Sequence, residues 1–366
     1  MQTNPFNPTF GDVPKIYLDN SDTAFQVANQ IRHATYPNAI LITGVRGSGK
    51  TVMLSRIEEI LQHDHRCHLI DLMSDSQLVD SFLNRLGDVS ASSVAKVLKK
   101  VAPSSINIEG VGFSFNKPTT TTIKDAASEM LVKLEKRHQF VVVCIDEVDN
   151  TEALRNFAKI FNELKRHHLP IHVIMTGLPD ILLSIQGSKT LTFLLRAQKE
   201  YTKALNKYDM YLAYQKVFQA DDAVLQQMVV LTKGYSYAFQ LLGSLAFKQT
   251  IQQKQPLDLP ALNSITLKYK QQLFANAYNK IFEELSSLDQ RYLILVGQGL
   301  KRQEIAKKLH KSANTVSQYR RRAIERCLVK PSVKGAGYVT YTLPFFDEFM
   351  SEIMNPGSMY YLDIEI

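Results

Sequence analysis

Cysteine is scarce in this sequence, which has three cysteines among 366 residues, at positions 67, 144 and 327. Because they are far apart and odd in number, they provide no disulfide framework and suit a reducing compartment. Long apolar runs are missing too, since none approaches the about 20 residues that a helix needs to cross a bilayer. The first five residues also lack the basic and then apolar pattern of a signal peptide. We therefore expect a cytoplasmic protein with no membrane association.

Acidic residues are few in one stretch near the C-terminus. Residues 301–330 contain ten Lys or Arg and only two Asp or Glu, a net charge of +8. The whole chain also has a net charge of +8, so the other 336 residues sum to zero. A local basic excess is what a nucleic-acid-binding surface requires. The length allows two or three domains, each with its own core.

A complete P-loop is the most specific motif that is present. The apolar run 39–43 enters Gly44, and four residues later the chain reads Gly49-Lys50-Thr51 before an amphipathic helix. Glycine allows main-chain N–H groups to surround phosphate oxygens closely, and the helix N-terminus favours the same anion. Lys50 can reach the β- and γ-phosphates, and the Thr51 hydroxyl can bind Mg²⁺. The residues expected to surround the nucleotide are Gly44, Val45, Arg46, Gly47, Ser48, Gly49, Lys50, Thr51 and Val52.

A second motif supports the first. Residues 140–145 form a β-branched apolar run, typical of a central parallel strand that is buried on both faces. The run ends in Asp146 and Glu147, the Walker B form. Asp146 is expected to hold Mg²⁺, and Glu147 to polarise the attacking water. A glutamate at this place favours hydrolysis of ATP over binding alone.

Four further residues are weaker candidates. The strand 171–177 contains Thr176, which suits a sensor of the γ-phosphate or an ordinary strand-end threonine. Arg196 ends a predicted helix and suits either an arginine finger that acts on a neighbouring subunit or a surface charge. Val13 and Pro14 lie in an extended arm rich in turn formers. They suit either a position beside adenine or a packed, irregular N-terminus. Residues 201–206 are expected to form a fifth strand, and residues 106–115 a hairpin.

The C-terminal pattern predicts a helix-turn-helix followed by a hairpin, the order of a winged helix. Helices are expected over 285–296, 302–309 and 313–327, and the hairpin over 334–343. On the third helix five side chains are expected to face outward and to suit base edges and phosphates. These are Asn314, Thr315, Gln318, Arg321 and Arg322. A winged helix that binds protein instead is the alternative.

Together these motifs resemble the AAA+-type P-loop ATPases, in the broad group of initiator and origin-recognition ATPases and the related STAND and archaeal-type ATPases. Weaker matches to this group are residues 4–14, 176–179, 191–196 and 234–237. Two departures stand out. The lid motif Gly234-Tyr235-Ser236-Tyr237 lacks the arginine of initiators and looks more like the Gly-x-Pro motif of STAND and archaeal-type ATPases, with Ser236 in place of proline. The Gly-Arg pair usual after the N-terminal arm is replaced by Leu18-Asp19-Asn20.

We predict an α/β fold with a P-loop NTPase core over 1–208, a helical lid over 209–280 and a winged-helix domain over 281–366. The resemblance implies ATP and Mg²⁺ as cofactors and hydrolysis as the activity, with nucleotide state controlling the binding of double-stranded DNA. Further partners are a second copy of the chain or another protein. The alternative is a STAND-like signalling switch or a transcription regulator whose winged helix binds protein.

Overall fold

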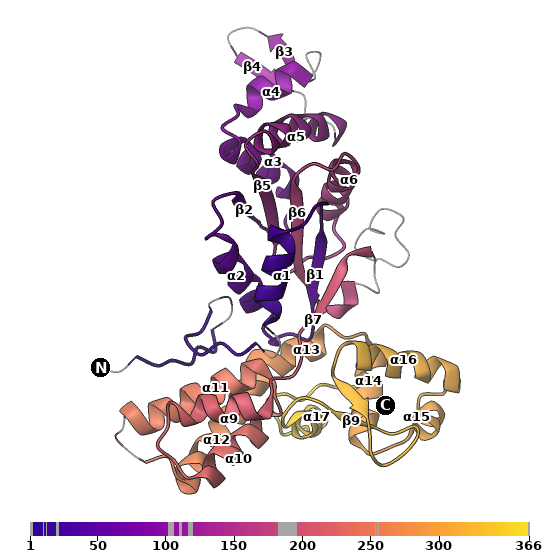
Figure 1. Ribbon diagram of the computed structural model, residues 1–366. Coiled ribbons are helices and arrows are strands. Elements are labelled where there is room, and N and C mark those ends of the chain that lie inside the picture. Colours follow the sequence, from indigo (N-terminus) through magenta and orange to yellow (C-terminus); the bar gives the residue numbers. More distant parts are fainter. Residues whose placement is uncertain are drawn as a thin grey trace. The chain divides into compact units, whose positions relative to one another are not determined.

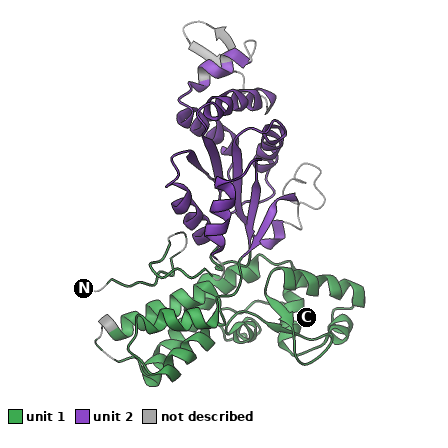
Figure 2. Cartoon of the chain, viewed as in Figure 1, with its two compact units in different colours: residues 1–20, 44–49, 202–366 green, residues 21–43, 50–201 purple. Residues whose placement is uncertain are grey.

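The computed structural model describes residues 3–9, 11, 13–19, 22–101, 106–109, 112–115, 120–181, 196–252, 254 and 256–364 (Figure 1). The chain forms two compact units (Figure 2). Residues 21–43 and 50–201 form one, here called the sheet unit. Residues 1–20, 44–49 and 202–366 form the other, here called the helical unit.

The sheet unit alternates strands and helices along the chain. Its elements are α1 (Thr23–Arg32), β1 (Ala39–Thr43), α2 (Lys50–Leu61), β2 (Cys67–Leu72), α3 (Leu78–Val89), α4 (Val94–Val101), β3 (Ile106–Glu109), β4 (Gly112–Phe115), α5 (Thr120–Glu135), β5 (Phe140–Ile145), α6 (Glu152–Arg166), β6 (Ile171–Gly177) and β7 (Gln198–Tyr201). Five strands form a parallel sheet in the order β2-β5-β6-β1-β7. The predicted α/β fold with a parallel sheet is therefore confirmed.

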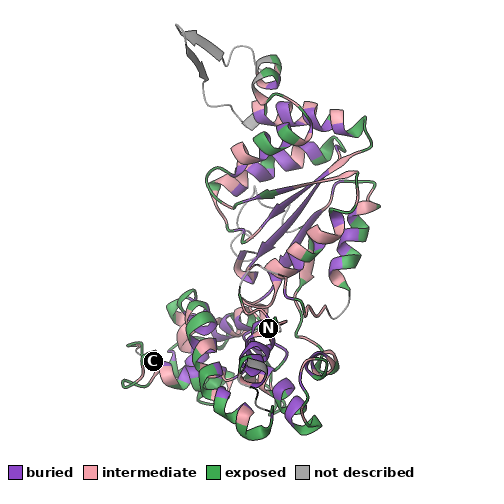
Figure 3. Cartoon of the chain, turned by 90° about the vertical axis from the view of Figure 1, so that its left-hand side faces the viewer, coloured by how far each residue is buried: buried purple, intermediate pink, exposed green. Residues whose placement is uncertain are grey.

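Alternating residues on each strand explain why helices cover both faces of this sheet. Ile40 and Ile42 of β1 pack in one core with residues of α1 and α2. Leu41, their neighbour, packs in a second core with residues of α3, α5 and α6. Side chains on a strand point alternately to its two faces, so a continuous apolar run fits a strand that is covered on both sides. The central strands are accordingly buried in Figure 3.

Two details concern the strands outside the centre of the sheet. β3 and β4 form the predicted antiparallel hairpin, with Ile106 opposite Phe115. The fifth strand spans Gln198–Tyr201, earlier than the predicted 201–206. It pairs with β1 from Gln198 to Tyr201, and beyond it Asn206 accepts hydrogen bonds from the first N–H groups of the next helix. A residue that caps a helix in this way cannot also extend the strand.

The described residues of the helical unit form helices and one short hairpin. Its elements are α9 (Lys207–Gln215), α10 (Asp222–Thr232), α11 (Ser236–Phe247), the π-helix η2 (Lys248–Gln252), α12 (Leu259–Leu273), the π-helix η3 (Phe274–Tyr278), α13 (Asn279–Glu283), α14 (Ser287–Gly297), α15 (Arg302–Lys308), α16 (Ala313–Glu325), β8 (Val329–Pro331), β9 (Val339–Tyr341) and α17 (Phe346–Ile353). α14 to α16 followed by the antiparallel β8–β9 hairpin have the order predicted from the sequence.

Within the helical unit, one hydrophobic core joins residues 209–280, here called the lid, and residues 281–366, here called the C-terminal segment. Tyr278 of η3 is buried, and its hydroxyl donates to the carbonyl of Pro344 at 2.6 Å. Phe274 packs against Phe349 of α17, with ring centroids 5.2 Å apart. The C-terminal segment is thus held by aromatic packing rather than tethered by a linker. The three domains with the boundaries predicted from the sequence stay a prediction.

The N-terminal arm also belongs to this core. Phe6 is buried and stacks on Phe218, with ring centroids 5.8 Å apart and planes 2° apart. A Cβ at Gly243 would lie 2.5 Å from the Phe6 ring, so the missing side chain in α11 makes room for it. The arm therefore contributes a side chain to the lid.

Among the described residues, no helix is long and apolar enough to cross a membrane.

Candidate functional site

The P-loop joins β1 to α2, as the sequence predicted. Gly47 and Gly49 have φ values of +74° and +92°, where residues with a Cβ are strained. The Ser48 N–H donates to the Val45 carbonyl at 3.1 Å and closes a tight turn. Lys50 is the first residue of α2 and is 8% exposed. Gly44 is buried, and the other predicted nucleotide-contacting residues from Val45 to Gly49, with Thr51 and Val52, are half-buried.

Contacts within the helical unit hold this loop. The Ser48 and Thr202 hydroxyl oxygens lie 2.6 Å apart. A Cβ at Gly44 would lie 1.8 Å from the Thr202 hydroxyl, so any side chain there would displace Thr202 from Ser48. The Arg46 guanidinium pairs with Glu284 at 3.4 Å, with both side chains about 30% exposed. Such an exposed pair stabilises the fold little.

Thr51, Asp146 and Thr176 meet at the carboxyl ends of the strands in the sheet unit. The Thr51 hydroxyl donates to the two carboxylate oxygens of Asp146, at 3.0 and 3.3 Å. Thr176, which is fully buried on β6, donates its hydroxyl to the same carboxylate. The structure therefore brings together both predicted metal-binding residues and the predicted sensor.

Glu147 follows Asp146 in a left-handed conformation, with φ +49°. Its main-chain N–H donates to the Thr176 hydroxyl oxygen at 3.0 Å, and its side chain is exposed. One hydroxyl thus holds two consecutive residues, since it donates to Asp146 and accepts from Glu147. The Glu147 side chain therefore lies in solvent directly after the half-buried Asp146.

The structure also places the weaker candidates. Arg196 is exposed and lies two residues before β7, while the rest of the predicted helix, 191–195, lies outside the described residues. Pro14 is buried and Val13 is half-buried, in an arm whose described contacts go to the lid. Near these two residues, the Ile16 carbonyl accepts from the Gln240 amide of α11 at 2.8 Å. The roles of these three residues stay predictions.

On α16, four of the five predicted outward residues are placed as expected. Asn314, Gln318 and Arg321 are exposed, and Thr315 is half-buried beside the N-capping Ser312. Arg321 forms an ion pair with Glu325 one turn along, at 2.7 Å. These positions are compatible with a contact surface.

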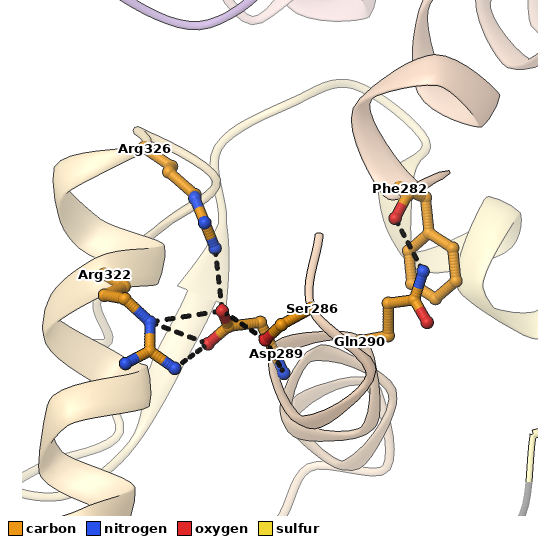
Figure 4. A network of polar contacts seen from close by, with 6 residues as sticks. All are labelled: Phe282, Ser286, Asp289, Gln290, Arg322 and Arg326. Carbon is orange, nitrogen blue, oxygen red and sulfur yellow. Dashed lines mark hydrogen bonds and ion pairs between the residues drawn. The ribbon is translucent and has the colours of Figure 1, made fainter. Parts of the chain in front are cut away.

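Arg322 is the exception, and the prediction that it faces outward is wrong. Its guanidinium donates to both carboxylate oxygens of Asp289 on α14, at 2.6 to 3.1 Å, and Arg326 donates to the same carboxylate at 3.0 Å (Figure 4). Position 322 lies between the buried Tyr319 and Ala323, so its long side chain follows the helix edge back to α14. The Asp289 side chain is 7% exposed, which makes this network structural.

Hydrogen bonds set the charge of Asp289 in this network. Burial alone would raise the pKa of Asp289, but hydrogen bonds from Arg322, Ser286 and Arg326 outweigh it, and the pKa is lowered. Asp289 is therefore ionised at neutral pH and neutralises part of the basic charge of α16.

An acidic cavity beside Asp146 was not found from the sequence. It encloses about 460 Å³ and is lined by residues that include Thr51, Glu58, Asp71, Cys144 and Asp146. Ligand atoms of Glu58, Asp71 and Cys144 lie within 4.8 Å of one another. Burial, and then the hydrogen bond and charge of Asp71, raise the pKa of Glu58 to about 8. The sequence signal that could have indicated it is an acid, Asp71, between the apolar residues Ile70 and Leu72 of β2.

Comparisons with known proteins agree with this geometry. Residues 32–184 match the family model described as an AAA domain, and residues 275–350 match a model described as a domain of unknown function. A search of curated proteins found no match.

Three solved structures are similar over nearly the whole chain. The Aeropyrum pernix ORC2 protein, in ADPNP and ADP complexes, has a TM-score of 0.59 at 11% identity, with 95% of this chain and 96% of that chain covered. Its ADP form has a TM-score of 0.51 at 12% identity, with 95% and 96% covered. Cdc6p from Pyrobaculum aerophilum has a TM-score of 0.50 at 11% identity, with 95% and 97% covered. Residues 32–184, which include the P-loop, thus match an AAA domain, and the chain is similar in fold to these archaeal proteins.

Proposed function

We propose that this chain binds Mg²⁺ and ATP at its P-loop, hydrolyses the ATP, and uses the nucleotide state to control binding of double-stranded DNA by its C-terminal segment. The observation that carries the first part is the cluster of Asp146 and Thr176 with Thr51, the last residue of the P-loop motif. Hydroxyl and carboxylate oxygens are the ligands that Mg²⁺ prefers, so Thr51 and Asp146 fit this ion. When bound, Mg²⁺ would neutralise charge on the phosphate oxygens.

The chain's own residues supply the remaining functions. The Lys50 ammonium would bind phosphate oxygens, with the P-loop residues 44–49 and Val52 around them. Glu147 would accept the proton of the attacking water, while Thr176 fixes its main chain and the Asp146 carboxylate. Arg196 would act on a neighbouring subunit's nucleotide, and Val13 and Pro14 would lie beside the adenine.

The test of the ATPase uses two substitutions with matched controls. Lys50→Ala should abolish nucleotide binding, because it removes the charge that reaches the phosphates, whereas Lys165→Ala on the exposed end of α6 should not. Glu147→Gln should keep ATP binding and stop turnover, while Glu163→Gln should change neither. ATP binding by Lys50→Ala within a few-fold of the unaltered chain would rule out the P-loop assignment.

For the DNA function, the support is the charge of the C-terminal segment. Besides Arg321, the exposed basic residues of this segment are Arg302, Lys307, Lys308, Lys311, Lys330 and Lys334. Asn314, Thr315, Gln318 and Arg321 would then contact base edges or phosphates. Because residues 274 and 278 pack into the C-terminal core, the full chain is the material to test.

The measurement is a salt titration of random duplex DNA with and without ATP. Arg321→Ala should flatten the slope of log affinity against log salt by about one unit if Arg321 meets a phosphate. Lys268→Ala, an exposed change on α12, is the matched control. If the full chain binds no duplex at low salt, the DNA function is excluded.

A second candidate is a signalling switch or transcription regulator whose C-terminal segment binds protein. The ion pairs favour it, because Arg322 and Arg326 are held by Asp289 and Arg321 by Glu325. Fewer arginines on α16 are then available to DNA than the sequence indicates. Salt-insensitive capture of a protein partner in place of duplex DNA would support this candidate.

A further inference from the structure

Three consecutive carbonyl groups of the P-loop accept hydrogen bonds from one short lid segment. The Tyr235 hydroxyl donates to the Arg46 carbonyl at 2.7 Å. The Tyr237 main-chain N–H donates to the Gly47 carbonyl at 3.0 Å, and the Ser236 hydroxyl donates to the Ser48 carbonyl at 3.1 Å. All of these residues belong to the helical unit. The segment lies at the start of α11, where the sequence shows Tyr-Ser-Tyr instead of an arginine-bearing lid motif.

The geometry of the peptide group makes these contacts relevant to phosphate binding. In a trans peptide, the carbonyl of one residue and the N–H of the next point in opposite directions. Because residues 235–237 hold the carbonyls on one side of the loop, the N–H groups of Gly47 and Gly49 point to the opposite side, here called inward. Phosphate binding by a P-loop depends on such inward N–H groups.

The lid segment is itself fixed and closely fitted. Tyr235 is 5% exposed and stacks on Tyr278, with ring centroids 6.4 Å apart. Burial raises the pKa of the Tyr235 hydroxyl above its ordinary value, so it remains a donor at physiological pH. A Cβ at Gly47 would lie 2.2 Å from the Tyr235 hydroxyl. The Gly234 carbonyl accepts from the Leu205 N–H at 2.8 Å, which holds the turn before the segment.

We propose that Tyr235 and Ser236 are positioning residues for the P-loop, which hold its carbonyls outward so that its N–H groups are ready for the phosphates of ATP or ADP. This inference rests on the proposed nucleotide binding and assigns a role to lid side chains. A loop held in its binding conformation loses less entropy when the ligand binds, so nucleotide affinity is higher. The two side chains touch no reacting atom and act through the main chain of residues 46–48.

The experiment compares Tyr235→Phe, Ser236→Ala and the double variant by titration with ATP and ADP. Each lost hydroxyl should weaken both nucleotides by roughly 3- to 10-fold, the range expected for one neutral hydrogen bond. Turnover at saturating ATP should stay within about threefold of that of the unaltered chain. KM should therefore rise with little change in kcat, because the lost contact supports the ground state and the transition state alike. Ser236→Thr, which keeps the hydroxyl, should restore the affinity of Ser236→Ala.

Two matched controls separate positioning from general stability. Tyr214→Phe removes a tyrosine hydroxyl that donates to the Phe239 carbonyl in the same lid, at 2.9 Å, away from the P-loop. Ser264→Ala removes a serine hydroxyl that donates to the Ala261 carbonyl at 2.7 Å. Both should leave nucleotide affinity unchanged, even where the melting temperature of the nucleotide-free chain falls.

The outcomes are distinct. If the unaltered chain binds ATP and the Tyr235 and Ser236 variants bind it equally well, the positioning role is wrong and the proposed function stands. If Tyr214→Phe loses as much affinity as Tyr235→Phe, the effect comes from lid stability and the positioning role is again wrong. If the unaltered chain binds neither nucleotide, the proposed function and this inference fall together.

Discussion

Arg322 of α16 binds the Asp289 carboxylate of α14 through its Nε and Nη2 atoms, and the Nη2 atom lies 2.6 Å from a carboxylate oxygen (Figure 4). The pair joins two helices of the C-terminal segment, and Arg326 completes it from the end of α16. Arg322, which the sequence predicted to contact DNA, is thus part of the packing between α14 and α16.

This pair predicts a stability difference between neighbouring arginines. Arg322→Ala should lower the free energy of unfolding by about 2–4 kcal/mol, because it leaves the buried Asp289 carboxylate with fewer partners. Arg321→Ala, whose side chain is 70% exposed, should lower it by less than about 0.5 kcal/mol. Urea denaturation of the full chain measures both. Equal losses would show that the Asp289 network contributes no special stability.

The Thr176 hydroxyl predicts a separation of turnover from binding. Thr176→Val keeps the shape but removes the group that contacts Asp146 and Glu147, so both are released from their positions. Turnover should fall roughly 10- to 100-fold, since small misplacements of catalytic groups cost this much, while ADP affinity changes little. Thr176→Ser should recover most of the activity. If Thr176→Val hydrolyses ATP at the normal rate, the hydroxyl has no catalytic role.

Glu58 predicts a pH dependence of stability. Its pKa is raised to about 8 in the folded chain from 4.5, so between these values the folded state holds a proton that the unfolded state has released. The free energy of unfolding should therefore decrease as pH rises from about 5 to 8, without Mg²⁺. Denaturation midpoints at several pH values test this.

Two variants control that measurement. Glu58→Gln should flatten the pH dependence, because the amide does not titrate. Glu59→Gln, a neighbour on α2 with an exposed ion pair to Arg56, should keep it. If the slope is the same in both variants, another group titrates.

Arg196 predicts activity that depends on neighbouring subunits. If its guanidinium reaches the nucleotide of a second copy, Arg196→Ala should lose up to roughly 10³-fold in turnover. Mixing it with Lys50→Ala should restore part of the activity, because one copy supplies an intact P-loop and the other an intact arginine. Arg166→Ala, 76% exposed on α6, is the control. Normal hydrolysis by Arg196→Ala alone at high protein concentration would exclude the finger.

The sequence by itself determined the features whose cause is local. The P-loop follows from glycines and a lysine within eight residues, and β5 from an uninterrupted apolar run that ends in Asp146. Parallel strands joined by helices place their carboxyl ends at one edge, so the meeting of Thr51, Asp146 and Thr176 could be expected. Exposure of Asn314, Gln318 and Arg321 followed from the period of the helix.

Only the tertiary structure decided contacts between residues far apart in the chain. Tyr235 lies 189 positions after Arg46, and Arg322 lies 33 positions after Asp289. Phe6 fills a space that Gly243 leaves open in α11. The helix period places Arg322 closer to the buried face of α16 than Arg321, but it does not show which partner either side chain reaches. Their difference depends on which of them reaches a buried carboxylate on another helix, and the packing of the helices decides that.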